Sequence, residues 1–344
     1  MTASVIKIDK KSNIPLYGVD FLGIIDRGTN IIELKPITTC NLKCKYCFVS
    51  SGDYKNNFIV DSNYLVEKVK ELVEIKGKRS IEIHIAPYGE ILLYNDVFEL
   101  IQSLWNIEGI EIISMQSNGL LLTPEIIKKL EEVNLTRINL SLNTLSEKLA
   151  NYLCNAKNYN VNALLQNIKL LLKSKIDVLI APVWFPGVND KDIENIVELV
   201  VELRSKGNSN KKIQLGIQKY LMYKTGRKLK KIRPKTWKYF YTQLSRLEKK
   251  YDIKLKLGPN DFGIHRRDTI VTKRLKKGDI LKIKIKSKGR WNNECIGKID
   301  DNKGIKVLIR KPLTFSEEMI GKEIEVKIIK ANYRDNIITA SFPL

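Results

Sequence analysis

Three of the five cysteines of this 344-residue chain lie within eight residues of one another. They are Cys40, Cys44 and Cys47, in the segment TCNLKCKYCF (39–48), directly after an apolar run. Structural zinc takes four ligands, usually in two pairs, and the chain offers no second cysteine pair and only two histidines, His84 and His265. Three thiolates suit a [4Fe–4S] cluster, which usually takes four cysteines, so one iron stays open for a substrate or cofactor. The loop therefore predicts an iron–sulfur centre with an open iron.

The elements that must position this loop alternate regularly between residues 31 and 220. Runs rich in Ile, Val and Leu predict buried strands at 31–36, 81–86, 111–116, 137–142, 177–183 and 213–220. Amphipathic runs predict helices at 62–75, 96–105, 124–133, 146–153, 161–173 and 190–205. Such alternation indicates an α/β fold with a parallel sheet, either open or closed into a partial barrel. In both arrangements the chemistry lies at the carboxyl ends of the strands.

The cysteine spacing C-x3-C-x2-C, with Tyr46 before the last cysteine, resembles the signature of the radical S-adenosylmethionine (radical SAM) superfamily. The segment Pro-Tyr-Gly-Glu (87–90) after the second predicted strand is similar to that family's Gly-Gly-Glu-Pro motif. It departs from the motif at Tyr88, which stands for the first Gly, and at Ile91, which stands for the Pro. By this resemblance, Gly89 and Glu90 are expected to contact the amino group of SAM.

The later strand ends carry weaker motifs, and their order along the chain strengthens the resemblance. The third predicted strand ends in Gln-Ser-Asn-Gly (116–119), similar to the family's Thr-Asn-Gly. The fourth and sixth predicted strands carry residues at positions that, in this family, contact the carboxylate, ribose and adenine of the cofactor. The expected SAM contacts are Tyr46, Gly89, Glu90, Gln116, Ser117, Asn118, Ser141, Asn143, Gln218 and Tyr220. The resemblance implies a partial (β/α)6 barrel of radical SAM type.

The resemblance also implies the chemistry. Cys40, Cys44 and Cys47 would hold the cluster, and the open iron would chelate the amino and carboxylate groups of SAM. One electron would then break the sulfonium bond and give a 5′-deoxyadenosyl radical, which removes a hydrogen atom from the substrate. An electron donor such as ferredoxin or flavodoxin is the expected partner. The cluster would be sensitive to oxygen, which agrees with a reducing compartment.

Two thiols and two imidazoles remain outside this scheme. Cys154 and Cys295 are expected as small core residues, although some radical SAM methylases use additional cysteines as methyl carriers. His84 is expected in the core or behind the site. His265, in a basic stretch, could contact a substrate or lie in a solvated loop.

Charge is concentrated toward one end of the chain, whose formal net charge is +22. Residues 1–218 hold 26 Lys and Arg against 25 Asp and Glu, whereas residues 219–344 hold 34 against 13. This asymmetry predicts a polyanion partner, with nucleic acid first and an anionic membrane surface second. A solvated lysine surface adapted to heat or salt is the alternative.

The C-terminal part changes character twice. The stretch 222–260 is a basic extension whose predicted helix opens at Pro234 and carries Trp237, Tyr239, Phe240 and Tyr241. Beyond it, alternating runs at 280–286, 304–310, 323–330 and 337–342 predict a small all-β domain. We therefore expect a radical SAM core at 1–260, a linker at 261–275 and a β-domain at 276–344.

The β-domain opens with a row of lysines. Alternation over residues 281–288 places four ammonium groups on one strand face, ~6.6–6.8 Å apart, close to the roughly 6–7 Å spacing of phosphates along a nucleic-acid chain. Arg290 and Trp291 follow and offer a planar cation and a stacking surface. The predicted RNA contacts are Lys282, Lys284, Lys286, Lys288, Arg290 and Trp291. The alternative is a lysine face that blocks edge-to-edge pairing of strands.

Residues 276–344 resemble a TRAM domain, a small β-barrel that binds tRNA in several RNA-modifying enzymes. The match rests on the strand pattern, the length and Gly321-Lys322 before the last long strand. A radical SAM core followed by a TRAM domain is the arrangement of tRNA methylthiotransferases. Those enzymes carry three further cysteines in an N-terminal domain, and no cysteine precedes the first predicted strand here. Methylthiolation is therefore not expected.

The leading hypothesis is a radical SAM enzyme that modifies an RNA, with tRNA as the first candidate. The alternatives are a radical SAM enzyme acting on a peptide or protein, and a non-enzymatic iron–sulfur protein that binds RNA. The chain has no apolar run of roughly 18 residues, and its first residues carry charges where a secretory signal would be apolar. A cytoplasmic protein with no membrane partner is expected.

Overall fold

The computed structural model describes residues 3–270, 275–332 and 335–344. By contacts the chain forms two compact units. The first unit combines Met1–Thr39, Asp53–Ile112 and Ile264–Leu344, and the second combines Cys40–Gly52 and Ile113–Gly263. Part of the predicted linker 261–275, residues 271–274, lies outside the described residues.

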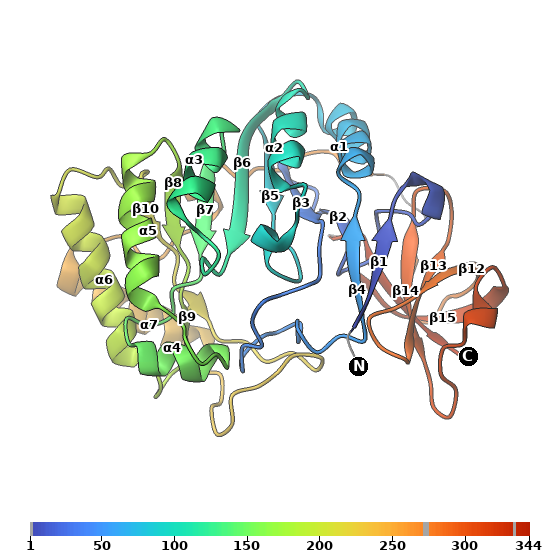
Figure 1. The fold of residues 1–344 in the computed structure, drawn as a ribbon. Coiled ribbons are helices and arrows are strands. Elements are labelled where there is room, and N and C mark those ends of the chain that lie inside the picture. Colours follow the sequence, from blue (N-terminus) through green and yellow to red (C-terminus); the bar gives the residue numbers. More distant parts are fainter. Residues whose placement is uncertain (1–2, 271–274, 333–334) are drawn as a thin grey trace. The chain divides into compact units, whose positions relative to one another are not determined.

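The first unit contains the early strands. Strand β2 (Gly23–Asp26) pairs antiparallel with β3 (Ile31–Lys35), which pairs in parallel with β5 (Ile81–Ile85). Strands β1 (Ser4–Ile8) and β4 (Asn56–Val60) form a separate parallel pair, which the sequence pattern did not predict. The strands predicted at 31–36 and 81–86 are therefore confirmed (Figure 1).

Two helices of this unit begin close to their predicted starts. Helix α1 (Ser62–Lys76) is capped by Asp61, whose carboxylate accepts a hydrogen bond from the amide of Tyr64. Helix α2 covers Val97–Trp105. Short 3-10 turns complete the elements of the chain at Lys10–Ser12, Ile91–Leu93, Pro259–Phe262 and Glu317–Met319.

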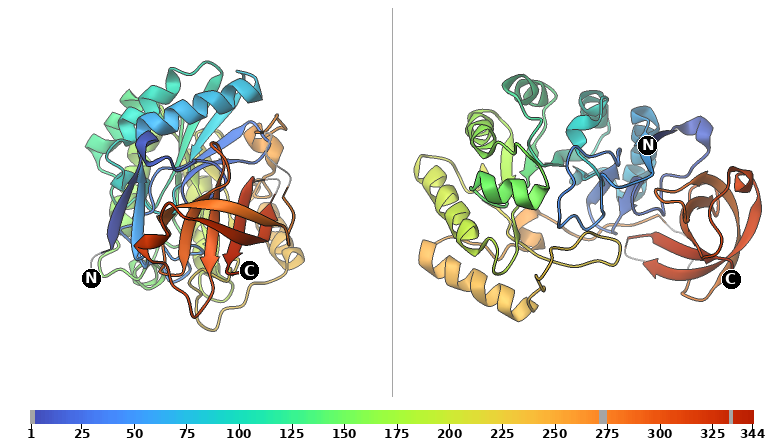
Figure 2. Two further views of the ribbon diagram at one scale, coloured as in Figure 1. Left: turned by 90° about the vertical axis from the view of Figure 1, so that its right-hand side faces the viewer. Right: turned by 60° about the horizontal axis from the view of Figure 1, so that its bottom comes forward.

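A closed barrel forms the C-terminal part of the first unit. Its strands, in the order in which they pair, are β12 (Ile280–Lys288), β13 (Glu294–Lys298), β14 (Gly304–Ile309), β16 (Ile337–Phe342) and β15 (Glu323–Asn332). Figure 2 shows these strands curving around a common core. The four predicted strands are confirmed, and β13 was missed because its sequence ECIGK does not alternate. Closure leaves no long open edge on the sheet.

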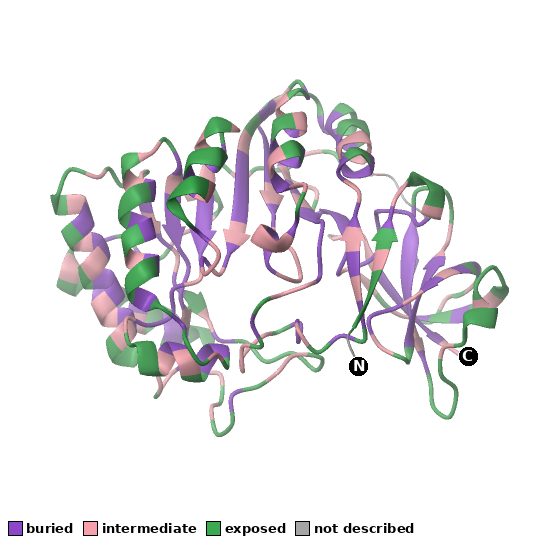
Figure 3. Cartoon of the chain, viewed as in Figure 1, coloured by how far each residue is buried: buried purple, intermediate pink, exposed green. Residues whose placement is uncertain are grey.

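The second unit holds the other parallel strands, in the order β10 (Ile213–Leu215), β8 (Asp177–Ile180), β7 (Arg137–Leu140) and β6 (Ile110–Ser117). They alternate with helices α3 (Pro124–Glu132), α4 (Glu147–Cys154), α5 (Val161–Lys173) and α6 (Asp190–Ser205). Figure 3 shows strands that are mostly buried and helices that are buried on one side. This is the predicted strand–helix alternation.

The predicted strands 177–183 and 213–220 end early. Beyond Ile180 and Leu215 the backbone forms a second, short parallel pair, β9 (Val183–Trp184) with β11 (Gln218–Lys219). Helix α7 covers Trp237–Tyr251 and begins three residues after Pro234, because the hydroxyl of Thr236 caps the amide of Tyr239. Within the described part of the chain, no helix is long and apolar enough to cross a bilayer.

Candidate active site

The three clustered cysteines lie in the second unit on the loop 40–52, and all three are free, half-buried thiols. The loop turns tightly, since the amide of Cys47 donates to the carbonyl of Cys44 at 3.1 Å. Next to them, the amide of Lys45 donates to the carbonyl of Leu153 near the end of α4, at 2.8 Å. No three His, Cys, Asp or Glu side chains among the described residues converge as they would around a metal ion. Three thiols on one short loop are the donor set that a thiolate-held cluster requires. In this structure their sulfur atoms do not point toward one shared metal position.

An arginine that the sequence analysis did not single out holds this loop. The amide of Arg227 donates to the carbonyl of Cys47 at 2.8 Å, and its Nε donates to the carbonyl of Cys44 at 2.7 Å. Another guanidinium nitrogen of Arg227 donates to the carbonyl of Ser51 at 2.8 Å. Three loop carbonyls are thereby satisfied by one residue of the basic extension, and the positive charge lies beside the thiols.

Tyr46 is brought to the predicted strand-end residues. Its ring packs on Phe185 with centroids 4.7 Å apart, and Phe185 packs on Tyr220 at 5.2 Å. Its hydroxyl accepts a 2.5 Å hydrogen bond from the side-chain amide of Asn143. Burial raises the pKa of Tyr46 well above its usual value, so this residue stays a neutral phenol.

The next strand ends meet in the same unit. The side-chain amide of Gln116 donates to the hydroxyl of Ser141 at 3.0 Å. That of Asn118 donates at 2.7 Å to the side-chain oxygen of Asn41, the residue after Cys40. The hydroxyl of Ser117, in contrast, accepts from the amide of Gly119 and supports the turn.

Gln218 lies apart from these contacts, exposed in the short strand β11, where its backbone pairs with Val183. The hydroxyl of Tyr220 accepts a hydrogen bond from the amide of Leu229 at 3.1 Å. That contact ties Tyr220 to the start of the basic extension.

Cys154 is buried, as expected, but it is not a plain core residue. It lines a small pocket together with Ser141, Asn143, Thr144, Ala150, Leu153 and Tyr159. It also lies within hydrogen-bonding reach of Cys44, and this contact raises the pKa of the Cys44 thiol. The other isolated thiol, Cys295, is fully buried in the barrel core and was correctly expected there.

In the first unit, Gly89 and Glu90 pack against the backbone of Thr39. The amide of Glu90 donates to the carbonyl of Thr39 at 2.8 Å, and a Cβ at Gly89 would lie 2.0 Å from that same oxygen. Glu90 is buried and accepts a hydrogen bond from the amide of Leu92. Only glycine therefore permits the observed approach of the two backbones.

Tyr88, where the sequence departs from the family motif, has a specific environment. The ammonium group of Lys35 lies 4.7 Å from the ring centroid of Tyr88, and the guanidinium carbon of Arg290 lies 5.8 Å from it. Lys35 in turn pairs with Glu33 at 2.6 Å and donates to the carbonyl of Ala86 at 2.8 Å. Two cations thus lie within cation–π range of the Tyr88 ring.

Arg290 is buried, whereas a residue that contacts RNA must be exposed. It is 4% exposed, and two of its nitrogens donate to the two carboxylate oxygens of Glu294 at 3.0 and 2.9 Å. Its guanidinium also packs over the ring of Phe21 at 4.2 Å. The prediction for this residue is corrected, because its hydrogen-bonding capacity is used inside the protein. Trp291 is half-buried and packs edge-on against Tyr54.

The four lysines of β12 occupy alternate positions, two of them exposed and two half-buried. They have acidic neighbours that the sequence analysis did not consider. In the register with β15, Lys282 faces Glu325 and Lys284 faces Glu323. Lys288 pairs with Glu317 at 3.2 Å. The row is therefore less positive than four isolated ammonium groups would be.

The two histidines lie in different settings of the first unit. His84 lies in β5, half-buried, in register with Glu33 of β3. His265 is exposed, and its backbone amide donates to the side chain of Asn30 at 3.0 Å.

Comparison with known proteins gives a consistent result. A family model of the radical SAM superfamily matches residues 34–200, and a TRAM domain model matches residues 274–335. The uncharacterized protein MJ0103 of Methanocaldococcus jannaschii is 36% identical over 346 residues, which cover 95% of this chain and 78% of that protein. The GTP 3′,8-cyclase of Aquifex aeolicus is 28% identical over 180 residues, covering 52% of this chain and 55% of the cyclase. This chain thus matches about half the length of that enzyme.

Among solved structures, Streptococcus suis SuiB bound to its precursor peptide SuiA aligns with a TM-score of 0.50 and 17% identity. The match covers 72% of this chain and 49% of that one. At this identity the likeness concerns the fold. The two family models and the closed C-terminal barrel confirm the expected architecture of an α/β radical SAM fold followed by a small β-barrel.

Proposed function

Because the chain belongs to the radical SAM superfamily and carries a TRAM domain, we propose that it is an enzyme that modifies RNA, with tRNA as the substrate. The observation that carries the proposal is the presence of both domains in one chain. Enzymes of this superfamily use a [4Fe–4S] cluster and SAM, which supply a 5′-deoxyadenosyl radical that removes a hydrogen atom from the substrate. A TRAM domain supplies a surface for nucleic acid.

We assign the three thiols of Cys40, Cys44 and Cys47 to the cluster. Arg227 keeps their loop in one conformation through its bonds to the carbonyls of Cys44, Cys47 and Ser51. Its charge favours the thiolate forms that bind metal. An anionic centre beside a fixed guanidinium is also easier to reduce than one in an uncharged loop.

The remaining predicted residues are assigned to SAM. Gly89 and Glu90 would receive its amino group, through a backbone segment that Thr39 holds in place. Ser141 and Asn143, which line one small pocket, would contact the carboxylate and the ribose of SAM. Tyr46 and Tyr220 would close the hydrophobic side of this site, because both pack on Phe185.

The RNA part of the proposal is supported by charge. Residues 219–344 carry 21 more basic than acidic residues, and the barrel belongs to this part of the chain. Lys282 and Lys284 are exposed on β12 and remain the proposed phosphate contacts of the barrel. Arg290 is removed from this set because it is buried against Glu294.

The alternatives are less well supported. Membership in this enzyme superfamily overturns the non-enzymatic alternative. A peptide substrate has no specific support, since the likeness to SuiB concerns the fold. The similarity to GTP 3′,8-cyclase makes a free nucleotide the competitor that an experiment must include. We further propose that the protein works in the cytoplasm, with ferredoxin or flavodoxin as its electron donor.

The test compares substrates under oxygen-free conditions. The reconstituted protein is reduced in the presence of SAM with unmodified tRNA, with GTP, or with neither, and 5′-deoxyadenosine is quantified. We expect tRNA to stimulate the formation of 5′-deoxyadenosine. Mass spectrometry should also find one modified tRNA nucleoside in cells that have the gene and not in cells that lack it. Stimulation by GTP alone, with identical nucleoside profiles, would show that the substrate is not RNA.

A further inference from the structure

A second basic surface lies in the second unit, separate in sequence from the barrel. The segment 219–241, called the basic aromatic segment below, contains nine Lys and Arg residues and no Asp or Glu. It runs from the end of β11 into the first turns of α7. A field of this density on one short segment attracts polyanions.

The same segment exposes large aromatic side chains. Trp237 is 52% exposed, and Tyr223, Tyr239 and Tyr241 are also exposed. The rings of Trp237 and Tyr241 are stacked, with centroids 5.7 Å apart and planes inclined by 24°. Aromatic rings held open to solvent in this way offer flat faces for stacking.

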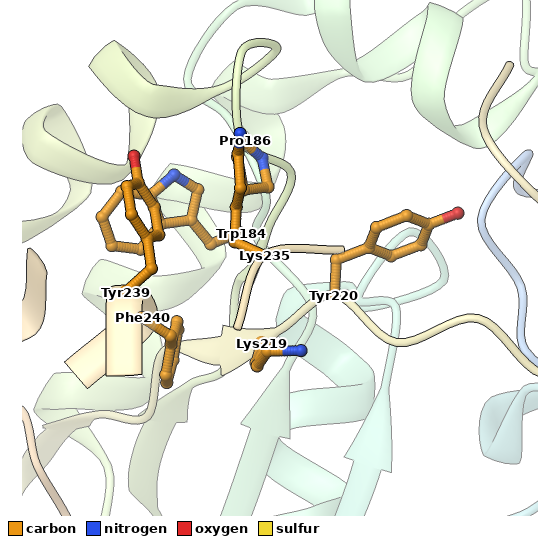
Figure 4. A pocket seen from close by; sticks show the side chains of 7 residues that line it. All are labelled: Trp184, Pro186, Lys219, Tyr220, Lys235, Tyr239 and Phe240. Atoms are coloured by element: carbon orange, nitrogen blue, oxygen red, sulfur yellow. The ribbon is translucent and has the colours of Figure 1, made fainter. Parts of the chain in front are cut away.

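Cations accompany these rings. The ammonium group of Lys219 lies 4.9 Å from the ring centroid of Trp237, and that of Lys235 lies 5.7 Å from that of Tyr239. Lys219, Lys235 and Tyr239 also line a small pocket, shown in Figure 4, together with Trp184, Pro186, Tyr220 and Phe240. Rings next to ammonium groups are the combination that binds single-stranded nucleic acid, in which bases stack and phosphates pair with cations.

This segment is attached directly to the cysteine loop. Arg227 donates to the carbonyls of Cys44 and Cys47, and the hydroxyl of Ser50 donates to the carbonyl of Thr225 at 2.9 Å. The ring of Phe48 on the loop lies 5.8 Å from that of Tyr223. The part of the segment from Tyr223 to Arg227 therefore lies beside the residues assigned to the cluster.

We propose that the basic aromatic segment binds an unpaired stretch of the RNA substrate and presents one of its nucleotides to the active site. This inference rests on the proposed function and deepens it. The barrel would bind the phosphate backbone of the RNA, and the basic aromatic segment would bind its unpaired bases. Bases can stack on a ring only when they are unpaired, so the segment selects a loop, bulge or single-stranded end.

A membrane surface is a poorer fit to the same residues. The apolar side chains of α7, Phe240, Leu244 and Leu247, are buried in the protein. The exposed residues of the helix are aromatic, charged or hydroxyl-bearing, with no apolar stripe among them for the acyl region of a bilayer. Positive charge with stacking faces favours nucleic acid.

The test measures binding of the full, cluster-loaded chain to a fluorescent 12-nucleotide single-stranded RNA and to its duplex, without oxygen. Loss of one stacked base costs ~1–3 kcal/mol, so we expect Trp237→Ala to weaken single-strand binding by about tenfold and to leave duplex binding unchanged. Leu170→Ala is the control, because Leu170 is also exposed in the second unit but belongs to α5, outside both the basic aromatic segment and the cysteine loop. It should bind like the wild type.

A second variant keeps the rings and removes charge. Replacing both Lys235 and Lys238 by Ala should make the slope of log affinity against log salt concentration less steep by roughly 1.4, at ~0.7 per phosphate contact on a single strand. This variant tests the segment even if Trp237→Ala folds poorly.

The outcomes separate this inference from the proposed function. If the Trp237 and lysine variants bind single strands like the wild type while tRNA is still modified, the segment is not the binding surface and the enzyme assignment stands. If wild-type protein binds vesicles containing phosphatidylserine through Trp237 but binds no RNA, the inference is overturned. If no tRNA nucleoside changes and no RNA binds anywhere, the proposed function fails with it.

Discussion

The side chain of Asn143 holds Tyr46 of the cysteine loop against the strand ends. Its amide nitrogen donates to the phenol oxygen of Tyr46 at 2.5 Å, and its oxygen accepts from the amide of Val183 at 2.7 Å. One polar side chain thus orients an aromatic ring that lies between Cys44 and Cys47 in sequence and packs on Phe185. Buried polar groups satisfied on both sides in this way fix a single geometry.

We predict that Asn143→Ala impairs catalysis more than it impairs cluster assembly. The buried phenol loses its donor, which costs ~1–3 kcal/mol, and we expect 5′-deoxyadenosine formation to fall about tenfold with unchanged iron content. Tyr46→Phe is the matched variant, because it removes the acceptor and keeps the ring packing. If both variants keep wild-type rates, the contact does not organise the site.

A second prediction concerns the thiols. Changing Cys40, Cys44 or Cys47 to Ser should abolish the cluster's visible absorbance and its roughly four bound iron atoms. Cys154→Ser should retain both, because Cys154 approaches Cys44 without belonging to the loop. Loss of iron in the Cys154 variant would instead identify it as a fourth ligand.

A third prediction tests the backbone contact at Gly89. The Cβ of Gly89→Ala would lie 2.0 Å from the carbonyl oxygen of Thr39, so the segment must move and the bond from Glu90 is lost. We expect the SAM dissociation constant, measured by calorimetry, to rise at least tenfold. Gly258→Ala is the control, since its Cβ would meet nothing closer than 3.9 Å. Unchanged affinity would remove this segment from the SAM site.

A fourth prediction separates Arg290 from the exposed lysines. Arg290→Ala leaves the buried carboxylate of Glu294 unpaired, and we expect it to lower the free energy of unfolding by ~3–5 kcal/mol in urea titrations. Replacing Arg290 by Met and Glu294 by Leu together should recover most of this loss. Lys282→Ala should leave the free energy of unfolding almost unchanged and should weaken RNA binding.

The fifth prediction is a pH dependence. Burial alone would raise the pKa of Glu33, but the charges of Lys35 and Arg27 outweigh it and lower the pKa to about 2. Between this value and the ordinary value of 4.5, the folded state binds fewer protons than the unfolded state. The stabilisation is therefore complete above about pH 4.5 and is lost as the pH falls toward 2.

Thermal unfolding of cofactor-free protein and of Glu33→Gln between pH 5 and 2.5 measures this effect. At ~1.4 kcal/mol per pKa unit, the wild type should lose up to about 3 kcal/mol more than the variant. Parallel losses in the two proteins would show that the Glu33 carboxylate contributes nothing to acid stability.

Local features of the chain were predictable because their causes are local. Helices at 161–173 and 190–205 have the expected bounds, and Thr123 caps the helix that begins at Pro124. These elements depend on side-chain period, capping groups and backbone hydrogen bonds among near neighbours. The cysteine spacing is equally local, and so is the charge difference between the two parts of the chain.

The sequence by itself therefore determined the elements, the thiol loop and the cofactor class. Only the tertiary structure decided that Arg227 supports Cys44, which is 183 positions away, and that Arg290 is enclosed by Phe21 and Glu294. It also placed Cys154 beside Cys44 and acidic residues opposite the lysines of β12. Such contacts join residues far apart in the chain, and no periodicity or capping rule specifies which distant side chains meet when the chain closes on itself.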